Sequence, residues 1–418
     1  SSSAYKGILL FHSVGTGKCH AKDTPILMYD GSIKMVQDIE IGDLLMGDDS
    51  TPRRVLSLAQ GTDEMYDIVP VKGDKYTVNS EHILVLKYNS FGITKNHKRQ
   101  PNTPYRVDYF DNKKISKLSK SFKTIEEAVQ FLNKYKSEEK RIVEIPVNKF
   151  INLAPSLRRE LRGFRKGVDF VHKELPLDPY FIGVWLGDGG SRTSKFTTAD
   201  PEILEYMTKE VEKFGLNVKH EKNYDYIISG NGKVGNNFII NTLRRYNLLN
   251  NKHIPTDYLI NSRENRLKLL AGLIDTDGYY DIKGNVYEIT QKSNVLADGI
   301  LFLARSLGFA AYLSKCKKGC MYKGVKKEGI YNRIHISGDI EEIPVILPRK
   351  KANKRGQIKD VLVTGITVNS IGKGQYYGFT LDGNNRYLLG DFTVTHNTCS
   401  AIATATNSFE REGYTILW

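Results

Sequence analysis

The chain has 418 residues, of which 40% are hydrophobic and 26% charged, so it is long enough for two or three domains with hydrophobic cores of their own. No run approaches the roughly 18 apolar residues of a membrane span, and the first residues lack the basic and apolar pattern of a secretory signal. We therefore expect an intracellular protein of a reducing compartment, nuclear or cytoplasmic, with no membrane partner.

The net charge of +14 is concentrated in one part of the chain, because residues 84–170 hold 20 Lys or Arg against 9 Asp or Glu. Concentrated positive charge favours a polyanionic partner such as nucleic acid, since neutralising phosphates releases counterions. A solvated basic surface is the alternative. The cysteines are too few for a disulfide scaffold and lack zinc-ribbon spacing, so we expect no structural zinc site. They are Cys19, Cys316, Cys320 and Cys399.

Residues 7–18 begin like a phosphate-binding loop but do not finish as one. They read "GILLFHSVGTGK", an apolar strand followed by a glycine-rich loop that ends at Lys18. The Ser or Thr that such a loop requires is missing, because Cys19 follows. The next residues are strand-like and contain an Asp30-Gly31 turn, where a nucleotide-binding fold would have a helix. The loop is therefore interrupted after Lys18.

The far end of the chain supplies the missing part of this loop. If residues 19–397 are deleted from the sequence, Lys18 is followed directly by Thr398. The joined sequence reads "LLFHSVGTGKTCSAIA", which predicts a strand, a G-x-G-K-T loop and a helix. Gly15, Gly17, Lys18 and Thr398 would then bind nucleotide phosphates in the joined protein. The joined sequence resembles the first motif of superfamily 2 helicases, so we expect an insertion inside the P-loop of a helicase-type ATPase.

Two stretches near the ends share an all-β pattern. Residues 24–83 alternate short β-rich runs with Gly and Asp turns, and residues 361–397 resume the same style. We therefore expect one β domain whose two parts are separated by an insertion.

The middle of the chain reads as α+β with an internal repeat, over residues 173–345. The segment "YFIGVWLGDGG" resembles "LLAGLIDTDGYY", which sets Asp188 and Asp277 89 residues apart. Downstream, two helical segments end at Gly215 and Gly308, 93 residues apart. Two agreeing offsets indicate a duplication.

The basic segment between the β pattern and the repeat contains a candidate helix. Residues 124–135 read "TIEEAVQFLNKY", with Ile125, Val129 and Leu132 at helical spacing. We expect an amphipathic helix that buries these three side chains.

The residues at the two junctions fit a self-excising segment. Cys19 can attack the Lys18 carbonyl and convert the amide into a thioester, since sulfur is the strongest nucleophile available here at neutral pH. Thr398 can then accept the acyl group on its hydroxyl. Asn397 can cyclise onto its own carbonyl with proton transfer by His396, and an acyl shift restores a peptide bond. These steps need no cofactor.

The opening Cys19, the block "VNSEHILVL" and the closing run "YYGFTLDGNNRYLLGDFTVTHN" together resemble the intein family, in particular the vacuolar ATPase inteins of yeasts. The resemblance implies an all-β Hint (hedgehog/intein) splicing domain in which His82 activates the amide before Cys19, with Asn79 as its companion in place of the commoner Thr. In the late motif this chain has Gly378 and Asn385 where many members have Asp and His, so their part in the later steps stays open.

The repeat brings two carboxylates into a position to bind metal. Helices that pack closely through small residues would set Asp188 and Asp277 side by side across a pseudo-two-fold axis. Hard divalent ions favour paired carboxylate oxygens, so we expect these two residues to bind Mg²⁺, or Mn²⁺. The small residues that permit the close packing are Gly183, Gly187, Gly272 and Thr276.

The run "LLAGLIDTDG" resembles the motif of the LAGLIDADG homing endonucleases, and "FIGVWLGDG" resembles its divergent first copy. The resemblance implies an αββαββα repeat whose saddle-shaped sheet lies in the major groove of double-stranded DNA. It also implies that Lys252 is the catalytic lysine of the first half. Lys351 is the expected second, with Lys350 as the alternative. By the same resemblance, the basic residues 90–150 form a DNA-recognition region.

The combined prediction is a monomeric, bifunctional intein: a Hint splicing domain interrupted by a two-repeat endonuclease. Its partners would be the intein-less host gene as double-stranded DNA, and the host ATPase or helicase in cis. One alternative is a splicing-competent intein with an inactive endonuclease, and another is a DNA-dependent ATPase or helicase fragment with a large insertion. The expected segments are 1–18 (N-extein), 19–172 (first part of the Hint domain), 173–345 (endonuclease), 346–397 (second part of the Hint domain) and 398–418 (C-extein).

Overall fold

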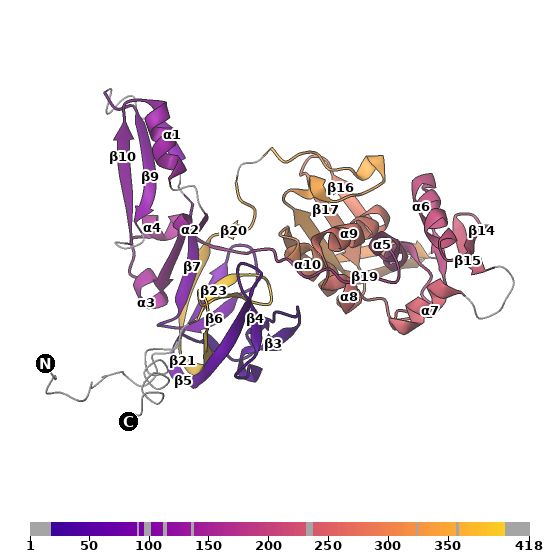
Figure 1. Cartoon of the computed structure of the whole chain (residues 1–418), viewed down its shortest axis with the longest axis horizontal. Helices are drawn as coiled ribbons and strands as arrows, with labels where there is room; N and C mark the ends of the chain where they lie inside the picture. Colours follow the sequence, from indigo (N-terminus) through magenta and orange to yellow (C-terminus); the bar gives the residue numbers. More distant parts are fainter. Residues whose placement is uncertain are drawn as a thin grey trace, which may run out of the picture. The chain divides into compact units, whose positions relative to one another are not determined.

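The structure is a computed structural model that divides into two compact units, the first built from both ends of the chain and the second from residues 166–362 (Figure 1). The predictions about Gly15, Gly17, Thr398 and the flanking host segments lie outside the residues that it describes. The described residues are 18–89, 92–95, 102–111, 115–134, 138–230, 237–322, 325–356 and 359–397.

The first unit is organised around two long strands from opposite ends of the chain. β5 (Pro52–Pro70) pairs antiparallel with β21 (Ile366–Leu381) over nearly its whole length. The short strand β1 (His20–Ala21) pairs with β21 on one side and with β6 (Tyr76–Asn79) on the other. The five-stranded sheet, completed by β4 (Leu44–Met46), has the order β21-β1-β6-β5-β4. The prediction that both ends form one β domain is confirmed.

Further strands close the first unit around buried aliphatic side chains. A second sheet has the order β11-β7-β12-β20, and its central strand reads "ILVLKY" without polar alternation because nearly all of its side chains are buried. Two small pairs, β2 with β3 and β22 with β23, complete the β structure. The bounds are Pro25–Leu27 (β2), Ile33–Met35 (β3), Ile83–Tyr88 (β7), Ile142–Pro146 (β11), Leu161–Phe164 (β12), Val363–Thr364 (β20), Arg386–Leu388 (β22) and Val394–His396 (β23), with short helices at Val36–Asp38 (η1), Glu138–Arg141 (α2), Val147–Phe150 (α3) and Pro155–Glu160 (α4).

The described part of the basic segment forms a small sheet covered by one helix. β8 (Gly92–Lys95), β9 (Tyr105–Asp111) and β10 (Ser116–Phe122) pair in the order β10-β9-β8. α1 (Ile125–Asn133) begins where the Thr124 hydroxyl accepts the Glu127 N–H, a standard N-cap.

The helix α1 is where the sequence predicted it, but its buried face is different. Ala128 is buried and packs with Phe131 and Leu132 against the sheet. Ile125 and Val129 are 41% and 38% exposed, so their predicted burial is wrong. The stripe that is buried also has helical spacing, and it presents the larger aromatic surface of Phe131 to the sheet.

The second unit contains the predicted duplication. Each copy has a buried helix that ends in Asp, then one strand in the first copy and two in the second, a second helix and a β-hairpin; the sheets have the orders β13-β15-β14 and β16-β17-β19-β18. Gly215 and Gly308 follow the second helix of each copy at φ +66° and +84°, a conformation that glycine adopts without strain. The bounds are Pro179–Asp188 (α5), Lys195–Thr197 (β13), Pro201–Glu212 (α6), Leu216–Lys222 (β14), Asp225–Gly230 (β15), Phe238–Arg245 (α7), Thr256–Leu259 (α8), Arg263–Asp277 (α9), Gly278–Asp281 (β16), Val286–Gln291 (β17), Asn294–Ser306 (α10), Ala310–Tyr322 (β18), Val325–Ser337 (β19), Ile340–Glu342 (η2) and Pro348–Lys350 (η3).

The first helices of the two copies, α5 and α9, touch backbone to backbone. A Cβ on Gly183 would overlap Leu269 O and lie 2.9 Å from Gly272 Cα, and one on Gly187 would overlap the Thr276 hydroxyl. The four small residues expected at this interface are therefore the ones that permit the contact.

The boundaries of the two units differ from the expected ones at 172/173 and 345/346. The structure divides the chain after Arg165 and after Leu362. The carbonyl of Val168 accepts a 2.7 Å hydrogen bond from Arg266 Nη2, and Lys350 Nζ donates to carbonyls of α9, so both flanking segments pack on the second unit. Among the described residues, no helix has the length and apolarity needed to cross a membrane.

Candidate active sites

The first candidate site surrounds the Lys18–Cys19 peptide bond. Cys19 is fully buried where β1 lies between β21 and β6. Its N–H, which belongs to this peptide bond, donates to Asn79 Oδ1 at 2.9 Å, and the Asn79 N–H donates back to the Cys19 carbonyl at 3.1 Å. Asn79 Nδ2 in turn donates to Asp63 Oδ2 at 3.1 Å. Asn79 therefore fixes the peptide bond that the nucleophile must attack.

His82 lies buried beside this peptide in its neutral form. Burial, and after it the neighbouring His20, His396 and Lys18, hold the pKa of His82 well below its usual range. Its Nε2 lies 2.8 Å from Thr395 Oγ1, and its Nδ1 has no hydrogen-bond partner within the described part of the chain. A neutral imidazole has one nitrogen that donates and one that accepts, so His82 can relay a proton.

The structure adds His20 and Tyr387 to the site, which the sequence did not single out. The rings of His20 and His82 meet edge-on, with centroids 4.6 Å apart. His20 Nε2 lies 2.6 Å from the Tyr387 hydroxyl, and burial lowers the pKa of His20 to about 3. The one available signal was that His20 directly follows the nucleophile in the chain.

Gly378 lies directly against the nucleophile. The pairing of His20 with Tyr377 sets the next residue of β21 beside Cys19. A Cβ on Gly378 would overlap Cys19 Sγ and lie 3.3 Å from the Lys18 carbonyl oxygen. The sulfur therefore fills the space that an Asp at this position would need, which explains the departure from the family pattern.

The second junction is held by the β22–β23 pair. Arg386 is the register partner of His396, and the Asn397 N–H donates to the Asn385 carbonyl at 3.0 Å. Asn385 has φ +60°, a left-handed conformation that Asn tolerates better than most residues. Burial, followed by Lys18 and Arg386, lowers the pKa of His396 to about 3. Asn385 thus acts through its backbone, in positioning the fully buried Asn397.

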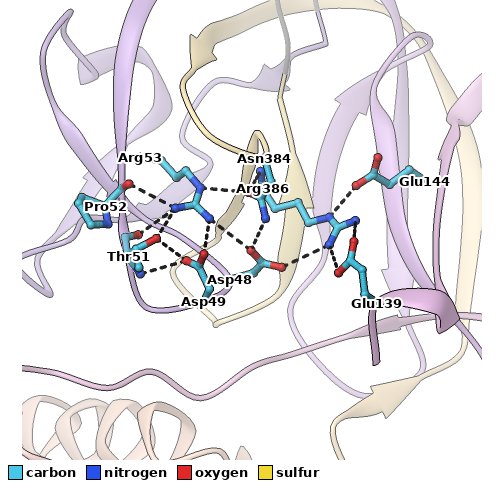
Figure 2. A network of polar contacts seen from close by, with 9 residues as sticks. All are labelled: Asp48, Asp49, Thr51, Pro52, Arg53, Glu139, Glu144, Asn384 and Arg386. Carbon is cyan, nitrogen blue, oxygen red and sulfur yellow. Dashed lines mark hydrogen bonds and ion pairs between the residues drawn. The ribbon is translucent and has the colours of Figure 1, made fainter. Parts of the chain in front are cut away.

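A network of charged side chains anchors this C-terminal pair to the earlier part of the first unit (Figure 2). Arg386 donates to Glu144 Oε1 at 2.6 Å and to Glu139 at 2.9 Å, and it lies 3.7 Å from Asp48. Asp48 also accepts from Asn384 Nδ2 at 3.0 Å. Because Arg386 is nearly buried, these contacts compensate its charge and hold β22 in register.

The third candidate site lies at the ends of α5 and α9. Asp188 and Asp277 are the last residues of the two helices. Burial, and after it the charge of Asp277, raises the pKa of Asp188 to about 6. Burial also raises the pKa of Asp277. Two partly desolvated carboxylates that repel each other fit a divalent cation, although among the described residues no group of three or more His, Cys, Asp or Glu side chains is gathered to hold one.

At the C-terminal end of each of these two helices, a lysine side chain donates hydrogen bonds to backbone carbonyls. Lys252 Nζ donates to the carbonyls of Leu186, Gly187 and Gly189 at 3.0, 3.1 and 2.7 Å. Lys350 Nζ donates to the carbonyls of Ile274, Asp275 and Thr276 at 2.8, 2.8 and 3.2 Å. Asp275 and Thr276 occupy the repeat positions of Leu186 and Gly187, so Lys350 is the counterpart of Lys252.

This placement favours the alternative that the sequence left open for the second lysine. Lys351 is exposed, and Lys350, the alternative, is buried at the helix end. Burial lowers the pKa of both Lys252 and Lys350. The segment just before Lys350 is fixed by Asp275, whose carboxylate accepts hydrogen bonds from the Ile346 N–H at 2.8 Å and from the Tyr180 hydroxyl at 2.8 Å.

Comparison with known families agrees with this division of sites. Residues 19–158 match the family model described as Hom_end-associated Hint, and residues 253–345 match the one described as homing endonuclease. The chain therefore contains one region that matches a Hint family and another that matches a homing endonuclease family.

The curated relatives include a helicase, an ATPase subunit and an endonuclease. The replicative DNA helicase DnaB of Mycobacterium intracellulare is 27% identical over 72% of this chain and 44% of that protein. The catalytic subunit of the V-type proton ATPase of Candida tropicalis is 22% identical over 91% of this chain and 43% of that protein. The homothallic switching endonuclease of Saccharomyces cerevisiae is 22% identical over 89% of this chain and 78% of that protein. The chain thus spans less than half of the helicase and ATPase relatives.

Solved structures similar to parts of the chain include a homing endonuclease and an intein. Mesophilic variants of the homing endonuclease I-DmoI are 12% identical over 39% of this chain and 88% of that chain, with a TM-score of 0.26. The gp41-1 intein is 16% identical over 31% of this chain and 80% of that chain, with a TM-score of 0.15. I-DmoI is described in complex with DNA and Ca in one structure and with DNA and Mn in another.

Proposed function

We propose that this chain is an intein that excises residues 19–397, joins Lys18 to Thr398, and also cuts double-stranded DNA at the uninterrupted host gene. The observation that carries the splicing part is the hydrogen bond from the N–H of the Lys18–Cys19 peptide to Asn79, in a buried site completed by strands from both ends of the segment. A buried thiol beside its own fixed peptide bond is arranged for attack on that bond.

The first step follows from these contacts. Cys19 Sγ adds to the Lys18 carbonyl carbon, the carbon–nitrogen bond breaks, and the thiol proton passes to the amide nitrogen. The step is neutral overall, so a neutral His82 can carry it by accepting a proton on one nitrogen and giving one from the other. The product is a thioester with a free amine on Cys19.

The later steps use the second junction. The Thr398 hydroxyl attacks the thioester carbonyl, the carbon–sulfur bond breaks, and the hydroxyl proton passes to the leaving Cys19 thiolate, which gives the branched ester and restores the thiol. Asn397 then attacks its own carbonyl through its side-chain nitrogen, which breaks the peptide bond to Thr398 and leaves a succinimide. The freed Thr398 amine takes the acyl group from oxygen to nitrogen. Burial of Asn397 beside His396 keeps water from hydrolysing the branched chain first.

Mass spectrometry of the purified chain after overnight incubation tests the splicing part. We expect a species of residues 19–397 and a joined host peptide, and Asn397→Ala should block release of the excised segment. A polypeptide that stays in one piece would contradict splicing. It would favour the DNA-dependent ATPase alternative, which needs an intact phosphate loop where the chain has Cys19.

For DNA cleavage, Asp188 and Asp277 would hold Mg²⁺ or Mn²⁺, which when bound supplies a Lewis acid and an activated water. Lys252 and Lys350 stand at the same helix ends, where a lysine can orient the scissile phosphate. Incubation of the chain with a plasmid carrying the joined host gene tests this: we expect linear product with Mg²⁺ and none after Asp188→Asn. No cleavage by the unchanged chain would support the alternative of an inactive endonuclease.

Residues 90–150 are the proposed DNA-recognition region. Their described part presents an exposed helix and the basic strand β10, where Lys120 Nζ lies 5.0 Å from the Phe131 ring centre and stays available to phosphates. Filter binding of target DNA to a chain trimmed in this region should show weaker affinity. Unchanged affinity would remove the role. A monomeric state and a nuclear or cytoplasmic location remain predictions.

A further inference from the structure

Two hydroxyl groups of the C-terminal β pair contact the two histidines at the N-terminal junction. Thr395 Oγ1 lies 2.8 Å from His82 Nε2, and the Tyr387 hydroxyl lies 2.6 Å from His20 Nε2. Tyr387 and Thr395 are register partners in the β22–β23 pair, so their side chains leave the same face of it. All four side chains are buried.

These contacts fix the orientation of the imidazole rings. In a neutral imidazole, a hydrogen bond to one nitrogen restrains the rotation of the ring, and a hydroxyl partner can donate to that nitrogen or accept from it. Burial raises the pKa of Tyr387 well above its usual range, so its hydroxyl keeps its proton and can donate to His20 Nε2 or accept from it. His20 and His82 also contact each other edge-on, so the position of each ring limits the positions open to the other.

We infer that Thr395, assisted by Tyr387, is a positioning residue for the first step: it orients His82 for activation of the Lys18–Cys19 peptide. The inference rests on the proposed splicing function. Thr395 precedes Asn397 by two residues, so the residue that orients the base at the first junction belongs to the strand that carries the second. Thioester formation therefore requires that β23 is already docked, and the first bond is not broken before the second junction is assembled.

A purely structural role for Thr395 makes a different prediction. A hydroxyl that only satisfies buried polar atoms would, when removed, loosen β23 and slow the reaction at the adjacent Asn397. A positioning role affects the distant Lys18–Cys19 bond and spares the near one. The two junctions can be measured separately, because Asn397→Ala stops the reaction after the acyl transfers that begin at the Lys18–Cys19 bond, and Cys19→Ala leaves only Asn397 cyclisation.

The test combines Thr395→Val and Thr395→Ser with each of these backgrounds in the full chain. In the Asn397→Ala background, cleavage by hydroxylamine reports conversion of the Lys18–Cys19 amide into the thioester or the branched ester that follows from it. We expect Thr395→Val to slow it about tenfold or more, since loss of one buried hydrogen bond in the transition state is worth about 1.4 kcal/mol. Thr395→Ser should restore the rate to within about threefold. In the Cys19→Ala background, cleavage at Asn397 should change by less than about threefold.

Thr393→Val is the matched control, because it makes the same change two residues away, where no contact with either histidine is found among the described residues. It should leave both rates unchanged. Equal slowing of both junctions by Thr395→Val, an unchanged hydroxylamine rate, or failure of Ser to rescue would overturn the inference. No hydroxylamine cleavage in the Asn397→Ala parent itself would contradict the proposed splicing, and with it this inference.

Discussion

At the scale of single residues, the splicing site shows why one position departs from the family pattern. Gly378 faces Cys19 Sγ so closely that even a methyl group would overlap the sulfur. The backbone of β21 therefore forms the wall behind the nucleophile. In this chain the sulfur is held by packing, without a carboxylate at that position.

Gly378→Ala should slow thioester formation about tenfold or more, because the added Cβ displaces the sulfur from the Lys18 carbonyl. Hydroxylamine cleavage in the Asn397→Ala background measures the rate. Gly374→Ala is the control on the same strand, where a Cβ would approach only the flexible side chain of Met65, at 3.0 Å. If Gly378→Ala reacts as fast as that control, the sulfur is not confined as described.

The lysine assignment predicts a difference between neighbouring residues. Lys350→Met should reduce plasmid cleavage about 100-fold, as expected for loss of a group that assists proton transfer or orients water, and Lys252→Met should do the same. Lys351→Met should cleave nearly as well as the unchanged chain because this side chain is exposed. Rates are compared at saturating Mg²⁺, and a larger loss from Lys351→Met than from Lys350→Met would reverse the assignment.

The raised pKa of Asp188, about 6, predicts how metal binding depends on pH. Above pH 6 the carboxylate is charged and binds a cation, and below pH 6 a proton competes for it. The chain should thus gain thermal stability from Mg²⁺ at pH 7.5 and little at pH 5. Asp188→Asn should abolish the gain at pH 7.5. An equal shift of the unfolding midpoint at both values of pH would contradict this.

Residue chemistry alone leads to the predicted junction residues, because each step demands a particular functional group. Cys19, His396 and Asn397 follow from what a self-excising segment needs at its ends. His20 and Thr395 could not be inferred in this way, because their contacts arise from strand pairing between distant segments. The choice between Lys350 and Lys351 depended on a turn whose geometry a sequence spacing does not resolve to one residue.

At the scale of helices and strands, the sequence predicted which elements form better than which face is buried. The small residues of α5 and α9 indicated a close crossing, since few alternatives explain glycines at repeat positions in buried helices. For α1, two overlapping stripes had helical spacing, and only the position of the sheet decides between them.

The helix crossing predicts a stability effect confined to the second unit. Gly272→Ala would place a Cβ onto Tyr180 O and 2.8 Å from Val184 N, both backbone atoms that cannot move aside. We expect urea unfolding of this unit to lose about 1–3 kcal/mol, typical of overpacking. Gly299→Ala in α10 is the control, because its nearest neighbours lie at 3.4 Å and alanine favours helix. Equal stability of the two variants would show that the crossing relaxes.

At the scale of the whole chain, the second unit is an insertion whose two ends leave the first unit from paired strands. β12 pairs antiparallel with β20, with Gly163 opposite Thr364 and Phe164 opposite Val363. The sequence predicted an insertion but set its limits too narrowly, because the segments just outside the repeat motifs carry no motif of their own. Their assignment comes from hydrogen bonds such as that of Arg266 to Val168.

This pairing predicts that splicing survives removal of the whole second unit. Paired antiparallel residues have Cα atoms roughly 5 Å apart, so a loop of about four polar residues can replace residues 166–362. Arg165 should be kept, because it forms a buried ion pair with Asp391 at 3.1 Å. The shortened chain should yield the joined host peptide in the same mass assay and lose plasmid cleavage, while its Asn397→Ala form should yield none. A soluble, folded shortened chain that does not splice would mean that the second unit also supports the chemistry of the first.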